Sequence, residues 1–530
     1  MNALSFVILQ NQHNCNLILS YCCAEQSRVQ VVINSESELL TELTRLKASY
    51  GYYIWLTEDL SKQLDIGYKA GFDFTGIKMI DVSTEVNMLA QTHPSFVGNT
   101  LPSCITKAIR LLEKVISTHL QTNGQQNRQK AKQVLITQMI TRANYIKAIV
   151  KLTINSKGFP VDEQILKAIF TDKAQTISTI QEEINLHYGT LFLKNMENST
   201  KLLDHDRLKQ LAKNKGYQWE SSISGHYLKM DKGYLKQLAN QYPELRFFYD
   251  AITTINSIQS IDLLALETDG FIKPSLHLMT QKTGRNSPKP SEGYLLNSSH
   301  WIRSLIRPKP NHCIIAIDWC QQEIGIAATL SNDNKLIDIY NSSGGDVYLA
   351  LAKMAGFAPK SATKKTHPQI RQMFKTMQIG LGYGKTVWSL TTDIKQLSDS
   401  MRLADANNKA KKLHHWHKAT FIDYWHWIED TMNQARRSGF IRSLDGWTYF
   451  VTDSVRDTQL LNFPMQAKNC DKARTIKQVQ ESMDKACTDL FNGKIMLRTE
   501  LTVYDEFTHF NSKETTKSFE RFVSQLKEVA

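Results

Sequence analysis

The chain has 530 residues, which is too many for a single hydrophobic core, so we expect several domains. Its hydrophobic content of 42% and charged content of 22% are ordinary for a globular protein, and no run is apolar enough to span a bilayer. The eight cysteines show no CxxC pairs, which argues against a disulfide scaffold or zinc module and for a reduced, cytoplasmic protein. The net charge of +13 favours a polyanionic partner.

The N-terminal part of the chain predicts a small α/β layer. Three short apolar strands are expected within residues 4–35, and helical and strand patterns then alternate to residue 82. A polar stretch at residues 121–133 indicates either a linker or a solvated helix start. From about residue 134 to 260 the pattern is mostly helical, and residues 158–169 predict a turn that caps a new helix.

The second half of the chain combines apolar strands with helices. A strand buried on both faces is predicted at residues 314–317, and helices follow to about residue 440. A strand-like segment at residues 439–451 comes next, then a long helix around residues 465–487 and a second apolar strand at 501–504.

Carboxylates stand at the ends of both apolar strands. Asp318 follows the first strand, and Asp505 and Glu506 stand at the tip of the second. Two divalent ions about 3.5–4 Å apart could be held between such strands, where they would activate an attacking oxygen and stabilise a leaving pyrophosphate. Oxygen ligands of this kind suit Mg²⁺. A single strand-end acid is more often simply solvated, so the interpretation depends on the basic helix that lies between the two strands in the sequence.

That helix carries one stripe of residues spaced four apart, which are Arg371, Lys375, Ile379 and Tyr383. Pro368 fits the first helical position and Thr366 is a candidate cap. The two basic residues therefore fall in the first two turns, within reach of a triphosphate, although such a pair alone more often marks a solvated face. Glycines at positions 380, 382 and 384 disfavour a helix and suggest a hinge or the close approach of a flat group.

With these motifs in place, the chain resembles the family A (DNA polymerase I-like) DNA polymerases. DWCQQEI (318–324) is similar to the family's motif A, D-Y-S-Q-I-E-L, and RQMFKTMQIGLGYG (371–384) to motif B, R-x3-K-x3-[FY]-G-x2-Y-G. VYDE (503–506) is similar to motif C, V-H-D-E. Further matches follow the family's order: GFPVD (158–162), KTGRNS (282–287), GGDVY (344–348) and NFPMQ (462–466). The likeness covers roughly residues 135–530, and several spaced motifs make it specific.

The resemblance implies a two-metal nucleotidyl-transfer site. Its metal ligands would be Asp318, Asp505 and the backbone carbonyl of Trp319, with Glu506 and Lys375 as further catalytic residues. The implied nucleotide-binding residues are Arg371, Lys375, Ile379, Tyr383, Gln321, Glu323 and Tyr348. Glu323 would lie under the sugar as the gate against a 2′-hydroxyl, and Tyr383 at the templating position. The implied DNA-binding residues are Arg285, Asn462, Gln466 and Tyr504, of which Arg285 and Gln466 would read the minor groove.

The chain also departs from the family pattern. Trp319 and Cys320 stand for Tyr and Ser, Gly325 for an Arg, Ile379 for a Phe or Tyr, and Tyr348 and Tyr504 for His. DGWTYF (445–450) replaces a G-R-R-R run, which removes positive charge near the DNA. Because the two Asp, the Arg and the Lys remain, we keep the expectation of polymerase activity.

The implied fold is an α+β multidomain one, a right-hand polymerase of palm, thumb and fingers preceded by an RNase H-like α/β layer. We expect a degenerate 3′–5′ exonuclease-like domain at residues 1–125 and a polymerase domain at 126–530. The expected subdomains are the thumb at about 160–265, the palm at about 135–160, 266–330 and 440–530, and the fingers at about 331–440.

The N-terminal layer is expected not to proofread. The family's exonuclease begins with a D-x-E strand end, where this chain has Gln10 and Gln12, and an amide has no charge to hold a catalytic Mg²⁺. Glu58, Asp59 and Asp81 would be remnants of an ancestral site.

Two features outside these motifs have ordinary explanations. The histidine-rich segment 413–417 lacks a Cys or an acid that would complete a zinc site, so a packed helix is expected. Arg436 and Arg437 either contact DNA or cap a helix that ends before Gly439.

The sequence therefore predicts a template-directed DNA polymerase with two Mg²⁺ ions, for which Mn²⁺ can substitute. Its partners would be primer–template DNA and deoxynucleoside triphosphates, with no membrane; a monomer is expected, and its accessory partners and its role in replication or repair stay open. One alternative is a single-subunit RNA polymerase, against which Glu323 argues because an acid beneath a ribose would clash with the 2′-hydroxyl. The other is a non-catalytic nucleic-acid-binding relative, whose signature would be a lost metal ligand.

Overall fold

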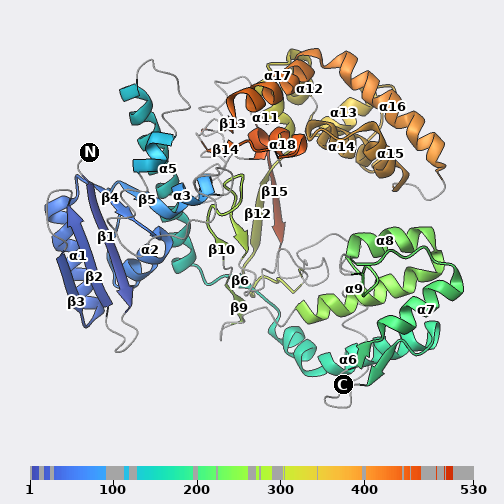
Figure 1. The fold of residues 1–530 in the computed structure, drawn as a ribbon, viewed down its shortest axis with the longest axis horizontal. Helices are drawn as coiled ribbons and strands as arrows, with labels where there is room; N and C mark the ends of the chain where they lie inside the picture. The colour runs from blue at the N-terminus through green and yellow to red at the C-terminus, as the bar shows by residue number, and fades with distance from the viewer. Residues whose placement is uncertain are drawn as a thin grey trace. The chain divides into compact units, whose positions relative to one another are not determined.

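The computed structural model forms two compact units (Figure 1). The first unit comprises Met1–Ser156, His277–Ser287 and Ile317–Leu501, and the second Lys157–Leu276, Pro288–Ala316 and Thr502–Ala530. The structure describes residues 3–10, 17–23, 29–90, 113–118, 128–194, 201–222, 225–260, 270–273, 276–288, 303, 305–342, 344–396, 401–443, 447–453, 455–466, 485, 495 and 497–504. No helix among these residues is long and apolar enough to cross a membrane.

The first unit begins with a five-stranded sheet whose strand order is β3-β2-β1-β4-β5. Its strands are β1 (Ala3–Gln10), β2 (Leu17–Cys23), β3 (Val29–Ile33), β4 (Ile54–Thr57) and β5 (Met79–Asp81). The first three strands are antiparallel neighbours, whereas β1, β4 and β5 run parallel. The three strands predicted within residues 4–35 and the α/β pattern are confirmed. The two later strands are shorter than the apolar segments of the sequence in which they lie. Residues 51–53 form a turn before β4, and β5 begins only at Met79.

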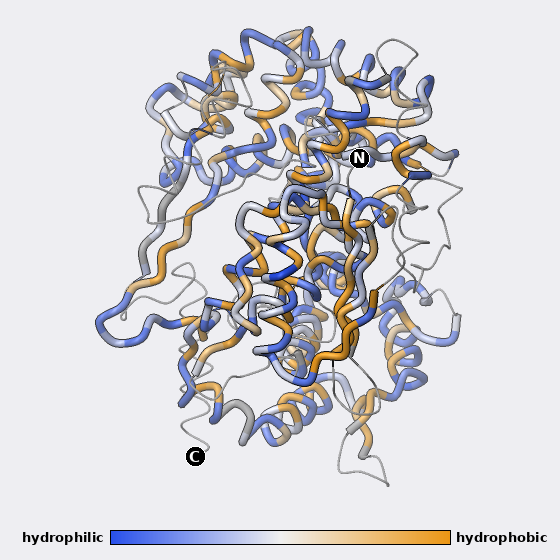
Figure 2. Tube along the Cα trace, turned by 90° about the vertical axis from the view of Figure 1, so that its left-hand side faces the viewer, coloured by the Kyte–Doolittle hydropathy of each residue, from blue (hydrophilic) through white to orange (hydrophobic). Residues whose placement is uncertain are grey.

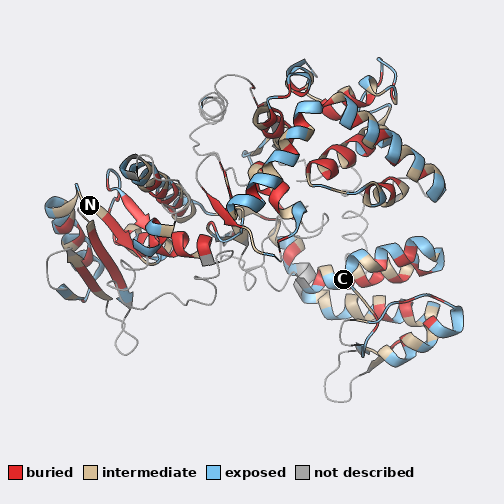
Figure 3. Ribbon diagram, turned by 45° about the horizontal axis from the view of Figure 1, so that its top comes forward, coloured by how far each residue is buried: buried red, intermediate tan, exposed pale blue. Residues whose placement is uncertain are grey.

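This sheet is accompanied by the helices of residues 3–90, which together with the sheet we call the N-terminal layer, and by the long helix that follows the layer. They are α1 (Glu36–Tyr50), α2 (Leu60–Lys69), α3 (Val82–Ala90) and, after the layer, α5 (Arg128–Asn155). In α1 the side chain of Ser35 accepts the N–H of Glu38, and buried leucines recur along one face of the helix. Because α5 begins at Arg128, the end of the polar stretch 121–133 is a helix start. Much of this sheet is buried, as the red ribbon in Figure 3 shows, although β3 is mostly exposed, and Figure 2 shows many apolar residues in orange along its strands.

The core of the N-terminal layer continues into a distant part of the sequence. The hairpin of β13 (Phe440–Arg442) and β14 (Thr448–Phe450), together with α18 (Asp457–Gln466), contributes to the same hydrophobic core. Trp55 of the sheet and Trp447 of the hairpin are both fully buried in it. The strand-like segment predicted at 439–451 is therefore confirmed as a hairpin. The helix predicted around residues 465–487 begins inside α18, and most of its length lies outside the described residues.

Seven described helices of the first unit surround a second core. They are α11 (Gln322–Ser331), α12 (Asn334–Ser342), α13 (Val347–Met354), α14 (Pro368–Gly382), α15 (Val387–Gln396), α16 (Leu403–Thr420) and α17 (Ile422–Ser438). Large rings such as Tyr340, Phe374 and Tyr424 are buried there. The prediction of helices up to about residue 440 is confirmed.

The second unit is mainly helical and has its own small core. Its elements are β6 (Phe159–Pro160), α6 (Glu163–Tyr188), β7 (Phe192–Lys194), β8 (Lys201–Leu203), α7 (His205–Lys215), α8 (Lys232–Gln241), η1 (Pro243–Leu245), α9 (Arg246–Ser260) and β9 (Phe271–Ile272). The side chain of Asp162 accepts the N–H of Ile165 and so caps α6, as the segment 158–169 predicted.

Two further pairs of strands complete the described structure. β10 (Leu276–His277) pairs with β11 (Ser287–Pro288), and β12 (Ile314–Trp319) pairs with β15 (Thr499–Tyr504). The two strands predicted from their apolar runs thus lie side by side. The expectation that the first is buried on both faces was wrong, because residues 314–317 are only half-buried. Among the described strands β12 has a single neighbour, so no wide sheet surrounds it.

Candidate functional site

Asp318 lies near the end of β12 with its carboxylate exposed. One carboxylate oxygen accepts the backbone N–H of Trp319 at 2.9 Å. The turn that follows is held in place, because the N–H of Cys320 donates to the carbonyl of Arg498 at 2.7 Å and the Tyr340 hydroxyl donates to the carbonyl of Cys320 at 2.9 Å. Asp318 therefore has a defined backbone position and a side chain open to solvent.

β15 ends at the half-buried Tyr504, and Asp505 and Glu506 lie outside the described residues, as does Gln12. Within the described part of the chain, no three acids, histidines or cysteines gather closely enough to hold a metal ion.

Gln321 links the turn after β12 to the GGDVY segment. Its backbone is left-handed, with φ 53°, at the start of α11. Its side-chain amide donates to the carbonyl of Gly345 at 2.8 Å and accepts the N–H of Val347 at 3.1 Å. Gly345 itself has φ 107°, a conformation that favours glycine. The nitrogen and the oxygen of this predicted nucleotide-binding side chain thus both make hydrogen bonds to the backbone of residues 345–347.

Glu323 lies beside two tyrosines. Burial and the neighbouring charge of Glu323 raise the pKa of Tyr348 to about 12. Burial and a hydrogen bond with Glu323 likewise raise the pKa of Tyr383 above its ordinary value. Two predicted nucleotide-binding residues, Tyr348 and Tyr383, therefore lie near the carboxylate of a third, Glu323.

The basic helix has the predicted form. α14 begins with Pro368 at its first position, and the residues of the stripe are all half-buried: Arg371, Lys375, Ile379 and Tyr383. The adjoining face packs Phe374 and its neighbours into the core. The prediction that Thr366 caps this helix was wrong. His367 occupies the cap position but its side chain does not cap the helix, and the Thr366 hydroxyl instead accepts the N–H of Thr363 at 2.9 Å.

Arg371 is ion-paired with a residue that the sequence analysis did not single out. Its Nε donates to a carboxylate oxygen of Asp346 at 2.7 Å, and its guanidinium lies over the Tyr348 ring, 5.5 Å from the centroid. The two charged side chains are only 23% and 14% exposed. Asp346 also caps α13 by accepting the N–H of Leu349. The sequence contained one sign of the role of Asp346: it is the Asp of GGDVY, a segment that resembles one of the family.

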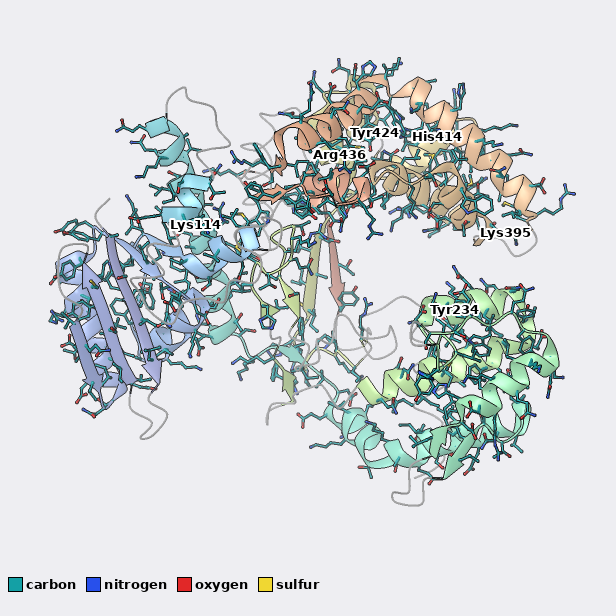
Figure 4. The ribbon with its side chains drawn as sticks, in the orientation of Figure 1. Lys114, Tyr234, Lys395, His414, Tyr424 and Arg436 are labelled. Carbon is teal, nitrogen blue, oxygen red and sulfur yellow. The ribbon has the colours of Figure 1, made fainter. Side chains whose placement is uncertain are left out.

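The glycines of motif B allow close packing. A Cβ at Gly382 would lie 2.9 Å from the hydroxyl of Tyr424 on α17, and one at Gly380 would lie 2.8 Å from Cδ of Lys385. Gly384 has φ 72° just after the helix end. The group that approaches α14 closely is therefore a ring of the protein itself, Tyr424, which is labelled in Figure 4.

Two of the predicted DNA-binding residues are connected to Tyr383. Nε of Arg285 donates to the carbonyl of Gln466 at 3.3 Å, and the side-chain amide of Gln466 donates to the Tyr383 hydroxyl at 3.0 Å. Asn462 lies one turn earlier on α18, and its side-chain oxygen is buried without a hydrogen-bond partner among the described residues. Two hydrogen bonds thus join Arg285, Gln466 and Tyr383 within the first unit.

The histidine-rich segment is part of helix α16. Nε2 of the fully buried His417 pairs with the side-chain oxygen of Gln378 at 2.9 Å, and its Nδ1 accepts the indole N–H of Trp425 at 3.0 Å. Burial lowers the pKa of His417 to about 3. Both ring nitrogens are used in packing interactions, in keeping with the packed helix that was predicted.

The two arginines near the end of α17 precede its glycine cap. The helix ends at Ser438, and Gly439 follows it with φ 75°. Arg436 (Figure 4) donates to a carboxylate oxygen of Asp457 at 2.6 Å and to the carbonyl of Val455. This arginine therefore ties the helix end to the segment that leads into α18.

The family model for DNA polymerase family A matches residues 163–529. Thermostable DNA polymerase I of Thermus aquaticus is 26% identical over 238 residues, which are 43% of this chain and 26% of that protein. Thermostable DNA polymerase I of Thermus thermophilus is 24% identical over 344 residues, 59% of this chain and 37% of that protein. The matched region is thus well under half the length of either relative.

A solved structure shares the fold of the whole chain. The POL domain of Pol1 from M. smegmatis, in complex with DNA primer-template and dNTP, has a TM-score of 0.62 and 16% sequence identity. The likeness covers 99% of this chain and 91% of that one. The predicted α+β multidomain polymerase fold is therefore confirmed. With the family model matched over most of its length, the chain belongs to DNA polymerase family A.

Proposed function

We propose that this protein is a DNA-directed DNA polymerase that adds deoxynucleotides to the 3′-hydroxyl of a primer and does not proofread. Family membership supports the reaction class, and the matched relatives are DNA polymerases I. The observation that carries the proposal is the position of Arg371 and Glu323, which both lie next to the buried ring of Tyr348. A guanidinium suited to phosphate and a carboxylate suited to exclude a 2′-hydroxyl are thus held around one ring.

Asp318 is suited to hold a divalent cation. Its carboxylate is exposed, and its hydrogen bond to the N–H of Trp319 leaves oxygen lone pairs available. With Asp505 and the Trp319 carbonyl, it would hold two Mg²⁺ ions. Bound there, such ions supply positive charge for the attacking oxygen and the leaving pyrophosphate. Mn²⁺ would be expected to substitute, since it prefers similar oxygen ligands.

The residues of α14 would bind the triphosphate. Asp346 orients Arg371 so that its guanidinium is shared between this carboxylate and an incoming phosphate. Lys375 lies one turn later on the same half-buried stripe and adds a second positive charge. We propose that the two residues together bind the β- and γ-phosphates and stabilise the charge that develops during transfer.

The N-terminal layer is proposed to have lost exonuclease activity. The backbone N–H of Ile8 in β1 donates to the uncharged side chain of Gln63 at 2.6 Å, in a buried setting. Two of the acids that remain nearby act as helix caps: Asp59 accepts the N–H of Lys62, and Asp81 accepts that of Ser83. These carboxylates already have structural partners, which supports a scaffold role.

Primer extension tests the proposal. The Asp318→Ala and Asp505→Ala proteins should bind primer–template DNA but lose Mg²⁺-dependent extension of a labelled primer. Asp430→Ala, which removes an exposed acid from α17, serves as the matched control and should extend the primer as the wild type does. Extension near the wild-type rate by either site variant would contradict the assignment. Parallel reactions with ribonucleotides and with RNA templates distinguish a DNA polymerase from the single-subunit RNA polymerase alternative.

A further inference from the structure

Trp447 connects the hairpin to a loop far away in the sequence. It belongs to DGWTYF, the segment that replaces a basic run of the family, and it is only 1% exposed. Its indole N–H donates to the backbone carbonyl of Lys282 at 2.9 Å. Lys282 opens the KTGRNS segment, which carries Arg285. A buried indole N–H needs such a partner, so this contact determines where the loop can lie relative to the hairpin.

The loop is shaped around the tryptophan ring. Gly284 has φ 73°, and a Cβ added there would lie 3.2 Å from the nearest ring atom of Trp447. Gly284 also donates its N–H to the carbonyl of Gln281 at 2.8 Å, and the N–H of Gln281 donates to the carbonyl of Arg285 at 3.1 Å. The turn from Gln281 to Arg285 is therefore closed on itself and packed against one ring.

The ring is in turn held by α5 and, through it, by α3 of the N-terminal layer. The guanidinium of Arg142, on α5, lies over the Trp447 ring, 5.9 Å from its centroid. Arg142 makes two hydrogen bonds with Glu85 of α3, at 2.8 and 2.6 Å, and the two side chains are only 4% and 1% exposed. Met88 of the same helix accepts the N–H of Thr448 through its sulfur at 3.4 Å. A buried ion pair with two hydrogen bonds is a rigid support, because breaking it would leave an unpaired charge in the core.

The contacts continue from the loop towards the candidate site. Arg285 donates to the carbonyl of Gln466, and Gln466 donates to the hydroxyl of Tyr383, whose pKa the neighbouring Glu323 helps to raise. All of these residues belong to the first compact unit.

We propose that Trp447 is a positioning residue, through which the N-terminal layer sets the place of the 281–285 turn and of the Arg285 guanidinium that binds primer–template DNA. The identity of the DNA ligand rests on the proposed function, whereas the positioning of the turn does not. A layer without exonuclease activity would thus still be needed for the polymerase site.

Hydrogen exchange measures the positioning directly, without any activity. Trp447→Phe keeps a buried ring and removes the bond to Lys282. The amides of Gln281 and Gly284 should then exchange faster by about tenfold, because the turn loses its anchor. The matched control is Trp55→Phe, which removes a buried indole bond of the same kind, to the carbonyl of Tyr50, inside the N-terminal layer. It should leave exchange in the turn unchanged. The proposal would be overturned if the amides of the turn exchange at the wild-type rate in Trp447→Phe, or if their exchange is equally faster in both variants.

Binding and kinetics test the consequence for DNA. In Trp447→Phe the Kd for primer–template should rise by about tenfold, as expected when a charged hydrogen-bond donor is misplaced. The KM for the nucleotide at saturating DNA should not change, and Trp55→Phe should match the wild type in both. Faster exchange with an unchanged Kd would refute the role of Arg285. If the wild type extends no primer, the proposed function fails, while the exchange result still decides the positioning.

A second pair of variants approaches the contact from the loop. Gly284→Ala would push a methyl group against the Trp447 ring, and Gly76→Ala introduces the same φ strain where nothing lies within 4 Å. Gly284→Ala should reproduce the Kd change of Trp447→Phe, and Gly76→Ala should not. This pair keeps the proposal testable if Trp447→Phe fails to fold, and equal Kd values for the two alanine variants would overturn it.

Discussion

Gly325 shows why a single residue can depart from the family pattern without loss of the fold. A Cβ at this position would lie 2.4 Å from Cδ2 of Leu497 and 3.2 Å from the Tyr340 ring. A side chain at this position would therefore require Leu497 and the Tyr340 ring to move. The space that an Arg at this position would need is occupied here by Leu497 and Tyr340.

Sugar selection is expected to depend on Glu323. Glu323→Ala should increase the ratio of ribonucleotide to deoxynucleotide kcat/KM, because it opens space under the sugar; each tenfold change corresponds to about 1.4 kcal/mol. Glu323→Gln is the matched control, since it keeps the size of the side chain and removes its charge. If selection is steric, the Gln variant should stay selective. An unchanged ratio in the Ala variant would place the gate at another residue.

The pH dependence of stability should reveal the buried Asp81. Burial, together with the nearby charge of Asp59, raises the pKa of Asp81 from 3.8 to about 7, although hydrogen bonds from Thr84 and backbone groups oppose the shift. The folded state therefore holds this proton more tightly than the unfolded state. Between about pH 4 and pH 7 stability should fall as pH rises, and above about pH 7 the loss should be complete.

Thermal unfolding between pH 5 and pH 8 checks this prediction. Asp81→Asn should flatten the fall in the unfolding midpoint across that range. Asp73→Asn is the control: hydrogen bonds from Thr75 lower the pKa of Asp73, so its contribution changes only at lower pH. If Asp81→Asn keeps the wild-type slope, another group is responsible.

At the scale of one element, helix α14 has a buried apolar face and, beside it, a half-buried stripe that includes two basic residues. Its apolar residues face the second core, and the half-buried stripe from Arg371 to Tyr383 runs along the boundary of that core. Glycines at its C-terminal end let Tyr424 approach the backbone. The helix is thereby held firmly while Arg371 and Lys375 stay accessible to a ligand.

The geometry of Arg371 predicts a specific defect in Arg371→Lys. A lysine keeps the charge but loses the planar fork that bonds Asp346 and lies over Tyr348. The KM for the deoxynucleotide should rise by about tenfold with a smaller change in kcat, because one charged hydrogen bond is lost. Arg402→Lys, at an exposed pair with Asp405, should behave as the wild type. Equal KM values in the two variants would exclude Arg371 from nucleotide binding.

At the scale of the whole molecule, the N-terminal layer is not a separate globule attached to a polymerase. Its sheet shares a hydrophobic core with α5, the β13–β14 hairpin and α18. The buried Glu85–Arg142 pair lies at the same junction. A layer with this much shared core contributes to stability whether or not it carries chemistry of its own.

The expected absence of proofreading is tested with a labelled primer that has a mismatched 3′ end. Incubated with Mg²⁺ or Mn²⁺ and no nucleotides, the primer should keep its length. The carboxylates of Asp59 and Asp81 both already accept hydrogen bonds from neighbouring residues of the protein. Shortening from the 3′ end that is lost in Asp81→Ala or Glu58→Ala but kept in Asp505→Ala would show that the layer is an active exonuclease.

The sequence alone determined what depends on local pattern. The four-residue spacing from Arg371 to Tyr383 together with Pro368 predicted α14 and its stripe, and short apolar runs predicted β1 to β3, β12 and β15. The order of the motifs led to the family. These features are local because hydrogen bonding within a helix, or the alternation of a strand, depends on residues a few positions apart.

Only the tertiary structure decided which distant residues meet. The pairing of Arg371 with Asp346, the packing of Gly325 against Leu497 and the bond from Trp447 to Lys282 all join residues far apart in the chain. Two predictions were wrong for the same reason: the cap at Thr366 and the burial of β12 on both faces. Such contacts arise from how whole elements pack, and packing depends on shape and volume summed over many side chains, which no short sequence pattern records.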